Sequence, residues 1–105
     1  MKYLAILEPA AGKTQADFAP LVMAEGLAIW DAYRGGSLRE MYFQPAPLVA
    51  TLVIEAVDEA AVHIMLAMLP FVAQHLFTTK VIMLGPWLPL EKMFDASFMN
   101  EAPHA

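Results

Sequence analysis

The sequence contains no cysteine among its 105 residues. Disulfide bonds, thiolate metal sites and a cysteine nucleophile are therefore excluded. Serine occurs only at Ser37 and Ser97, and no glycine-rich phosphate loop is present, so a serine triad and a nucleotide-phosphate site are not predicted. The three histidines, His63, His75 and His104, do not show metal-ligand spacing, and no metal site is predicted.

Positive charge is scarce. Lysine and arginine together number 6, the net charge is −5, and charged residues make up only 16% of the chain. A nucleic-acid backbone would be repelled, so nucleic acid is not an expected partner. The apolar run in "MKYLAILEPAAGK" is interrupted by Glu8 and Pro9 and is too short for a signal peptide or a spanning helix. We therefore expect a cytoplasmic protein without a membrane partner.

Hydrophobic residues are abundant. They make up 59% of the chain, where a typical domain has about 45–50%. A chain of this length forms one domain and has too little interior to bury so much apolar surface. The expected cover is a second copy of the same chain, which predicts a homodimer and leaves a higher homo-oligomer open. The 8 methionines suit such interfaces and adaptable pockets.

Prolines, glycines and hydrophobic periodicity divide the chain into alternating strands and helices. Residues 3–8 are strand-like, and a helix is predicted from Asp17, as its N-cap, to Arg34, before two glycines. Residues 37–44 and 48–56 then form a hairpin around the turn "PAP". A second helix begins at Asp58 and runs to about Leu69. Residues 78–85 form the last strand.

This β-α-β-β-α-β order predicts an α+β fold with a ferredoxin-like, four-stranded antiparallel sheet. Beyond Pro86 the chain becomes amphipathic, and we expect it to dock as a short helix up to about Phe98. The predicted single domain therefore covers residues 1–98, and residues 99–105 form a flexible tail.

Both faces of the predicted sheet are apolar. Leu48, Leu52 and Ile54 alternate with Val49 and Val53 along one strand. Helices can cover only one face, so a second sheet is expected on the other. Two sheets packed face to face form a dimeric α+β barrel, and the space between them is the expected ligand site.

Several segments together resemble the dimeric α+β barrel superfamily, in particular the small muconolactone isomerase-like and YCII-like proteins. These segments are "AIWDAYRGG", "LREMYF", "VDEAAVHIMLAMLPFV" and "VIMLGPWLPLEKMF". The resemblance implies a proton-transfer isomerase or lyase acting on a small apolar carboxylate or lactone. The alternative is a non-catalytic protein that binds a hydrophobic ligand or has an assembly role.

The chain departs from the patterns of these relatives in two places. YCII-like proteins pair an early histidine with an aspartate, whereas the first histidine here is His63. The related monooxygenases need an asparagine, and the only one here is Asn100. Haem-degrading members carry a histidine where His63 or His75 stands, but no second feature supports haem. No cofactor is predicted.

Glu25 is the most informative candidate for chemistry. On the first helix it falls beside the apolar stripe of Phe18, Val22 and Ile29. A carboxylate there must reach solvent at the helix edge, form a buried ion pair, or open into a cavity as an acid–base or ligand-binding group.

Arg39 and Glu40 are neighbouring charges at the start of an apolar strand. Strict alternation places Leu38, Glu40 and Tyr42 on one face and Arg39 on the other. The favoured arrangement pairs Arg39 with Glu25, while Glu40 and Tyr42 line the barrel. The reverse would give an arginine that binds a carboxylate ligand, and both charges could also lie solvated at the rim. In the enzyme hypothesis Glu25 or Glu40 is the base, Arg39 anchors the substrate and Tyr42 donates a hydrogen bond.

The two other histidine and tryptophan positions with a predicted role are His75 and Trp30, and His63 is a third side chain at the flank of a helix. His75 follows the break at Pro70 and is predicted as a base at the mouth of the pocket. His63 lies at the flank of the second helix, where a partly exposed structural role is expected. Trp30 forms a second apolar stripe on the first helix with Met23, and it is expected in an oligomer contact, under the C-terminal segment or in a ligand site.

Overall fold

The computed structural model of the chain describes residues 1–94, apart from the side chain of Glu91. The predicted continuation of the C-terminal helix to Phe98 and the predicted tail at residues 99–105 lie outside the described residues.

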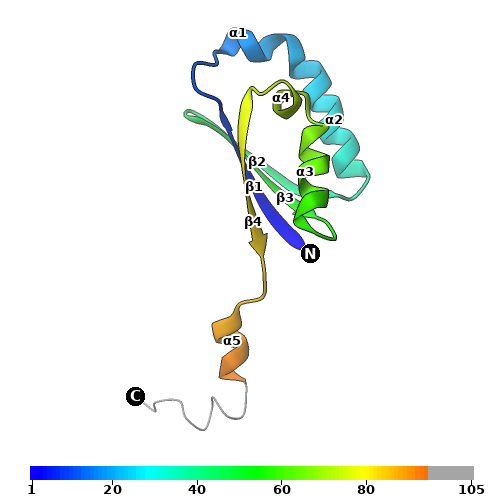
Figure 1. The fold of residues 1–105 in the computed structure, drawn as a ribbon, viewed down its shortest axis with the longest axis vertical. Helices are drawn as coiled ribbons and strands as arrows, with labels where there is room; N and C mark the ends of the chain where they lie inside the picture. Colours follow the sequence, from blue (N-terminus) through cyan, green and yellow to red (C-terminus); the bar gives the residue numbers. More distant parts are fainter. Residues whose placement is uncertain (95–105) are drawn as a thin grey trace.

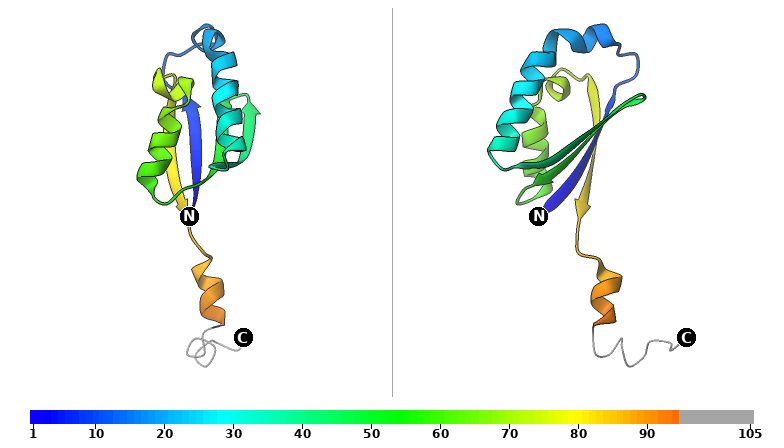
Figure 2. Two further views of the ribbon diagram at one scale, coloured as in Figure 1. Left: turned by 90° about the vertical axis from the view of Figure 1, so that its right-hand side faces the viewer. Right: turned by 180° about the vertical axis from the view of Figure 1, so that it is seen from behind.

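The fold is an antiparallel sheet covered on one face by helices, as Figures 1 and 2 show. In chain order the elements are β1 (Lys2–Pro9), α1 (Gln15–Phe18), the 3-10 helix η1 (Ala19–Leu21), α2 (Val22–Arg34), β2 (Leu38–Pro45), β3 (Leu48–Glu55), α3 (Glu59–Ala67), α4 (Pro70–Ala73), β4 (Phe77–Leu84) and α5 (Leu88–Met93). The strands lie in the order β2-β3-β1-β4, and every neighbouring pair is antiparallel. The predicted ferredoxin-like α+β fold is confirmed.

The first helix begins earlier than predicted and is interrupted. Thr14, not Asp17, is the N-cap, and the Asp17 carboxylate accepts hydrogen bonds from the Thr14 backbone N–H at 2.7 Å and from its hydroxyl at 3.2 Å. These bonds, the backbone one foremost, lower the pKa of Asp17. Pro20 has no N–H to donate, and the chain forms η1 there before α2 begins at Val22.

The second helical segment starts where the sequence predicts and then breaks at a proline. Asp58 is the N-cap of α3, and its side chain accepts a hydrogen bond from the Ala61 N–H at 2.8 Å. Leu69 has extended backbone geometry before Pro70, which is the first residue of α4. The break separates α3 from α4 and brings α4 under α2 (Figure 2).

A β-bulge at Arg39 changes the alternation in β2. Leu38 pairs with Ile54 and Glu40 with Val53, so Arg39 is an extra residue without a partner on β3. Leu38 therefore faces the helices, whereas Glu40 and Tyr42 lie on the opposite face. The prediction that these three residues share one face is wrong, because the bulge shifts every later side chain by one position.

The buried core lies between the sheet and the helices. Tyr3, Ala5 and Leu7 of β1 pack there with Ile54 of β3, and α3 contributes Val62, Leu66 and the following Leu69, as the sheet register and burial show.

No helix covers the other face of the sheet in the described part of the chain (Figure 1). We call it the open face. Lys80, Glu40 and Tyr42 lie on this face. Its other members, which are partly or largely exposed, include Leu4, Ile6, Val49, Thr51, Val53, Ile82 and Leu84. The predicted apolar character of both sheet faces is thus present in the fold.

We call residues 85–94 the C-terminal arm. The sequence predicts that this segment docks onto its own domain, but the described part of the arm does not. The arm continues beyond the end of β4 and carries α5 away from the sheet and the other helices (Figure 1). The apolar residues of α5 have no counterpart within reach on their own sheet, because β4 directs the arm outward. Among the described helices, none combines the length and apolarity needed to cross a bilayer.

Candidate functional site

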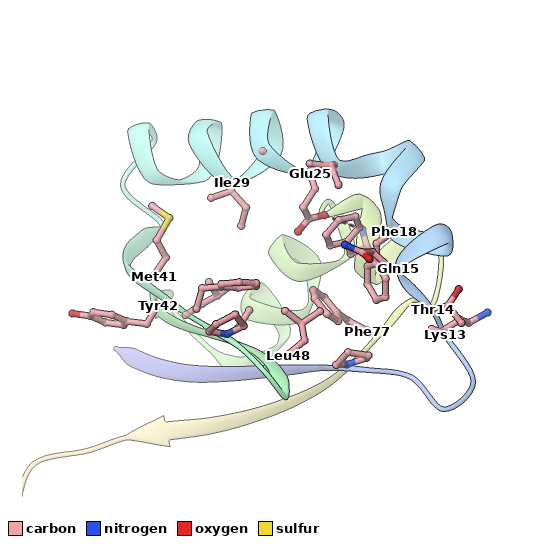
Figure 3. A pocket seen from close by; sticks show the side chains of 18 residues that line it. Lys13, Thr14, Gln15, Phe18, Glu25, Ile29, Met41, Tyr42, Leu48 and Phe77 are labelled. Atoms are coloured by element: carbon pink, nitrogen blue, oxygen red, sulfur yellow. Dashed lines mark hydrogen bonds between the residues drawn. The ribbon is translucent and has the colours of Figure 1, made fainter.

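A cavity of about 930 Å³ lies between α2 and the helix-facing side of the sheet (Figure 3). Its volume is within the range of about 300–1,000 Å³ typical of small-molecule sites. It is formed within a single chain, on the helix side of β2 and β3. The ligand site predicted from the sequence lies instead on the other side of the sheet, between two subunits.

One face of α2 forms the roof. Val22, Glu25, Gly26 and Ile29 all line the cavity, and their spacing of three and four residues puts them on one side of the helix. A Cβ atom added to Gly26 would meet no heavy atom within 4 Å. The space next to Gly26, beside Glu25, is therefore open.

The floor and the inner wall are apolar. Met41, Phe43 and Pro45 of β2 with Leu48, Ala50 and Leu52 of β3 form the floor. The wall is an aromatic cluster of Phe18, Phe71 and Phe77, whose ring centroids are 5.0, 5.3 and 5.4 Å apart. Two of these three ring pairs are edge-to-face, a favourable arrangement for aromatic rings. The lining therefore suits a largely apolar ligand.

Glu25 is the acidic side chain in this lining. Its Oε1 accepts a hydrogen bond from the backbone N–H of Phe71 at 2.8 Å. Phe71 is the second residue of α4, so Glu25 satisfies one of the free N–H groups at the start of that helix. Within residues 1–94, no buried side-chain oxygen lacks a partner. No described residue donates a hydrogen bond to Oε2, so this oxygen is not fully buried, and Glu25 lines the cavity.

Burial raises the pKa of the Glu25 carboxyl above its ordinary value of 4.5, and the Phe71 N–H partly offsets this effect. Desolvation disfavours the ionised form, whereas the N–H stabilises it. The carboxyl is therefore shifted towards the pH range in which it can both accept and return a proton.

The loop between β1 and α1 supplies polar residues at one end of the cavity. Lys13, Thr14 and Gln15 belong to the lining, and Figure 3 shows Lys13 and Thr14 beyond Phe18, at the α1 end. Gly12 has φ +79°, a left-handed conformation that glycine adopts without strain. This turn positions Lys13, the positively charged residue of the lining, and Figure 3 shows its side chain pointing away from Glu25.

The predicted ion pair between Arg39 and Glu25 does not form. The Arg39 Nε donates to the Gly36 carbonyl at 2.6 Å, and the side chain is exposed and outside the cavity lining. The bulge and this local bond hold Arg39 away from α2. Glu25 instead takes a backbone partner from α4.

Glu40 and Tyr42 lie together on the open face, as the favoured arrangement predicted. The Tyr42 hydroxyl donates to Glu40 Oε1 at 2.7 Å, and this bond raises the pKa of the Tyr42 hydroxyl. Tyr42 touches the cavity rim, but its hydroxyl points away from Glu25 (Figure 3). Glu40 is not part of the lining. The cavity therefore has Glu25, and not Glu40, as its carboxylate.

The remaining candidates lie elsewhere. His75 is exposed, has φ 58° and follows α4, where left-handed residues commonly end a helix. Trp30 stacks on Tyr33 with ring centroids 6.0 Å apart on the outer face of α2, and His63 is exposed on α3. Neither His75 nor Trp30 lines the cavity. Among the described residues, no group of three His, Asp or Glu side chains could hold a metal ion.

Sequence reasoning found Glu25 but missed Lys13 and Phe71. Lys13 lies in a turn-forming segment, where a lysine usually indicates only solvent exposure. Phe71 acts through its backbone N–H, which every residue except proline has, so no side-chain pattern indicates this role.

A scan against protein-family models gives no match, and a search of curated proteins also gives none. Among solved structures, the chain is similar to the 5-chloro-2-hydroxyhydroquinone dehydrochlorinase TftG from Burkholderia phenoliruptrix AC1100, in complex with 2,5-dihydroxybenzoquinone. The TM-score is 0.66 at 17% sequence identity, over 81% of this chain and 94% of that one. The similarity shows a shared α+β fold.

Proposed function

We propose that this protein binds a small, largely apolar molecule in the cavity beneath α2 and catalyses proton transfer with Glu25, as an isomerase or a lyase. The observation that supports this most is the position of Glu25. It is a half-buried carboxyl within an apolar lining, with a raised pKa and one oxygen that is not fully buried and accepts no hydrogen bond from a described residue.

In this proposal Glu25 acts as a general base. The Phe71 N–H fixes Oε1, so that Oε2 can take a proton from a carbon of the ligand. Return of the proton to a different carbon gives an isomerisation. Loss of a leaving group from the adjacent carbon gives an elimination.

The proposed substrate class is a small carboxylate or lactone, or a related flat ring with an anionic oxygen. The apolar floor and the aromatic wall would hold the ring, and Lys13, the positively charged residue of the lining, would attract the anionic group as the ligand approaches. Lys13 replaces Arg39 as the proposed anchor, since Arg39 lies outside the cavity. The similar dehydrochlorinase holds 2,5-dihydroxybenzoquinone, a flat ring with acidic hydroxyls, which is therefore a suitable first probe.

Ligand binding in this cavity can be tested at Gly26. Gly26→Leu would place a side chain in the open space of the roof, and we expect the affinity for a bound ring acid to fall at least ~10-fold through steric exclusion. The measurement is calorimetric titration of 2,5-dihydroxybenzoquinone, small aromatic acids and lactones.

Gly26→Ala is the matched control. Its methyl group meets nothing within 4 Å, so we expect binding to be retained and the helix to be stabilised by about 0.5–1 kcal/mol. Binding that is equally strong in the leucine variant would place the ligand elsewhere. Failure of the whole panel to bind would contradict the proposed substrate class.

The open face supports a second part of the proposal, a homodimer in which two open faces pack together. The face is partly exposed and apolar in both central strands, with Leu4 opposite Val53 at its middle. Two such sheets would bury this surface and form the barrel that the sequence predicts.

Val53→Lys is expected to convert this dimer to a monomer, because two lysines would meet at the centre of the interface. Light scattering should give twice the chain mass of 11.6 kDa for the unchanged protein and the single mass for the variant. The matched control is Val57→Lys, at a valine that is 81% exposed outside the sheet. An unchanged protein that is monomeric at micromolar concentration would refute the dimer.

A further inference from the structure

The open face carries two side chains of opposite charge on opposite edges of the sheet. Glu40 lies on β2, which is one edge strand, and Lys80 lies on β4, which is the other. Both side chains are exposed, and within residues 1–94 neither forms an ion pair. The two edges are three strand spacings of about 4.8 Å apart, so Glu40 and Lys80 of one chain do not pair with each other.

The strand register places these charges at nearly the same height in the sheet. One row across the open face, from β2 to β4, consists of Tyr42, Thr51, Ile6 and Lys80. Glu40 lies in the next row of β2, and the Tyr42 hydroxyl donates to its Oε1 at 2.7 Å. The Glu40–Tyr42 pair therefore stands at one end of this row and Lys80 at the other.

A second charged row lies on the two central strands, near the start of β1. Lys2 of β1 pairs directly with Glu55 of β3. Both belong to the open face, because they are two residues from Leu4 and Val53 on the same strands. The central strands thus carry one charge of each sign at this end of the sheet.

Two-fold symmetry relates two such faces in one of two aligned arrangements. The strands of aligned sheets lie within about 30° of each other, so the axis between the sheets is close to perpendicular or close to parallel to the strands. A perpendicular axis places β2 over β2 and β4 over β4, which gathers both Glu40 carboxylates along one edge and both Lys80 ammonium groups along the other. A parallel axis keeps the rows level and reverses the strand order. It therefore places β2 over the partner's β4, and β1 over the partner's β3.

We propose that the two copies are related by an axis parallel to the strands, so that Lys80 of each chain binds the Glu40–Tyr42 pair of the partner subunit. This inference rests on the homodimer proposed above and adds the contacts that fix its orientation. In the same arrangement Lys2 lies opposite Glu55 of the partner subunit. Opposite charges thus face each other in both rows, and complementarity of this kind favours one orientation and disfavours the other.

Charge reversal tests the pairing in the full chain. Lys80→Glu brings carboxylates together at both edges of the interface, so we expect the dimer dissociation constant to rise at least ~10-fold. Adding Glu40→Lys restores opposite charges, and the constant should return to within ~3-fold of its original value. The control is Arg34→Glu at the exposed end of α2, which changes the net charge equally outside the open face and should change the constant less than ~3-fold. Analytical ultracentrifugation measures all four proteins.

Cross-linking between differently tagged chains tests the orientation directly, since the chain has no cysteine of its own. One chain carries Tyr42→Cys and the other Lys80→Cys. The two are co-expressed and treated with a thiol reagent that spans about 10 Å, the distance between packed sheets. We expect the mixed product in at least ~10-fold higher yield than the product of two Tyr42→Cys chains or of two Lys80→Cys chains, whose cysteines lie on opposite edges.

The outcomes separate this pairing from the dimer itself. A dimer that Lys80→Glu leaves unchanged, or that Glu40→Lys does not restore, would overturn the pairing and leave the homodimer intact. Better cross-linking between two identical variants than between the mixed pair would support the perpendicular axis and overturn the proposed one. A monomer in light scattering would refute the dimer and the pairing together.

Discussion

Replacing Glu25 by glutamine is expected to lower the rate of proton transfer in the cavity about 10²–10⁴-fold. The amide has nearly the same shape and can still accept the Phe71 N–H bond through its oxygen, but it is not a base. The rate is measured by NMR as incorporation of solvent deuterium into a bound lactone or ring acid in D₂O. Affinity for the ligand should change little, because the apolar lining is intact.

The same substitution should make the folded state more stable at neutral pH. Burial raises the pKa of Glu25 above 4.5 in the folded state. Between 4.5 and this raised value, the unfolded state therefore binds fewer protons than the folded state. The carboxyl therefore favours folding fully only at low pH, and its contribution is lost as the pH rises from about 4.5 through the raised value. Glu25→Gln removes this loss, and unfolding in urea at several pH values would show a flatter profile.

Glu59→Gln is the control for both measurements, since Glu59 is exposed in the first turn of α3, outside the cavity. It should leave the exchange rate unchanged. Exchange that persists at the wild-type rate in Glu25→Gln would remove Glu25 as the base. Tight ligand binding without any deuterium exchange in the unchanged protein would instead support the non-catalytic binding role.

Replacing Phe18 by alanine is expected to lower the free energy of unfolding by about 3 kcal/mol. Phe18 is only 9% exposed and contacts the rings of both Phe71 and Phe77. This value is at the lower end of the range for replacing a buried phenylalanine by alanine, because Phe18 already borders an open cavity. Since the total stability of a domain is about 5–15 kcal/mol, this is a large share.

Urea unfolding at fixed protein concentration measures this effect, with Phe43→Ala as the control. Phe43 also lines the cavity but is 66% exposed, so its loss should cost less than ~1 kcal/mol. If the two alanine variants were equally destabilised, the aromatic cluster would not be the structural wall of the site.

Local signals in the sequence were sufficient for the element order. Asp58 begins a helix because its side chain can accept an N–H bond, and Pro70 ends the same segment because it cannot donate one. The start of the first helix was misplaced by three residues, since Thr14 and Asp17 are both good capping residues and only their mutual bond shows which is the cap.

The register of β2 could not be predicted. An extra residue at Arg39 is compatible with the same amino-acid pattern as a regular strand, and only the pairing with β3 reveals the bulge. This one position separates Leu38 from Glu40 and Tyr42. The bulge also holds Arg39, the predicted partner of Glu25, away from α2.

The sequence by itself determined the fold class, the apolar excess and the unusual position of Glu25, because alternation, helical periodicity and capping are properties of neighbouring residues. Only the tertiary structure decided that Glu25 faces a cavity beneath α2, that its partner is the N–H of Phe71, and that Lys13 belongs to the lining. The Glu25–Phe71 bond alone joins residues that are 46 positions apart. These features arise from how the helices pack on the sheet, and backbone groups carry no residue-specific signal for that packing.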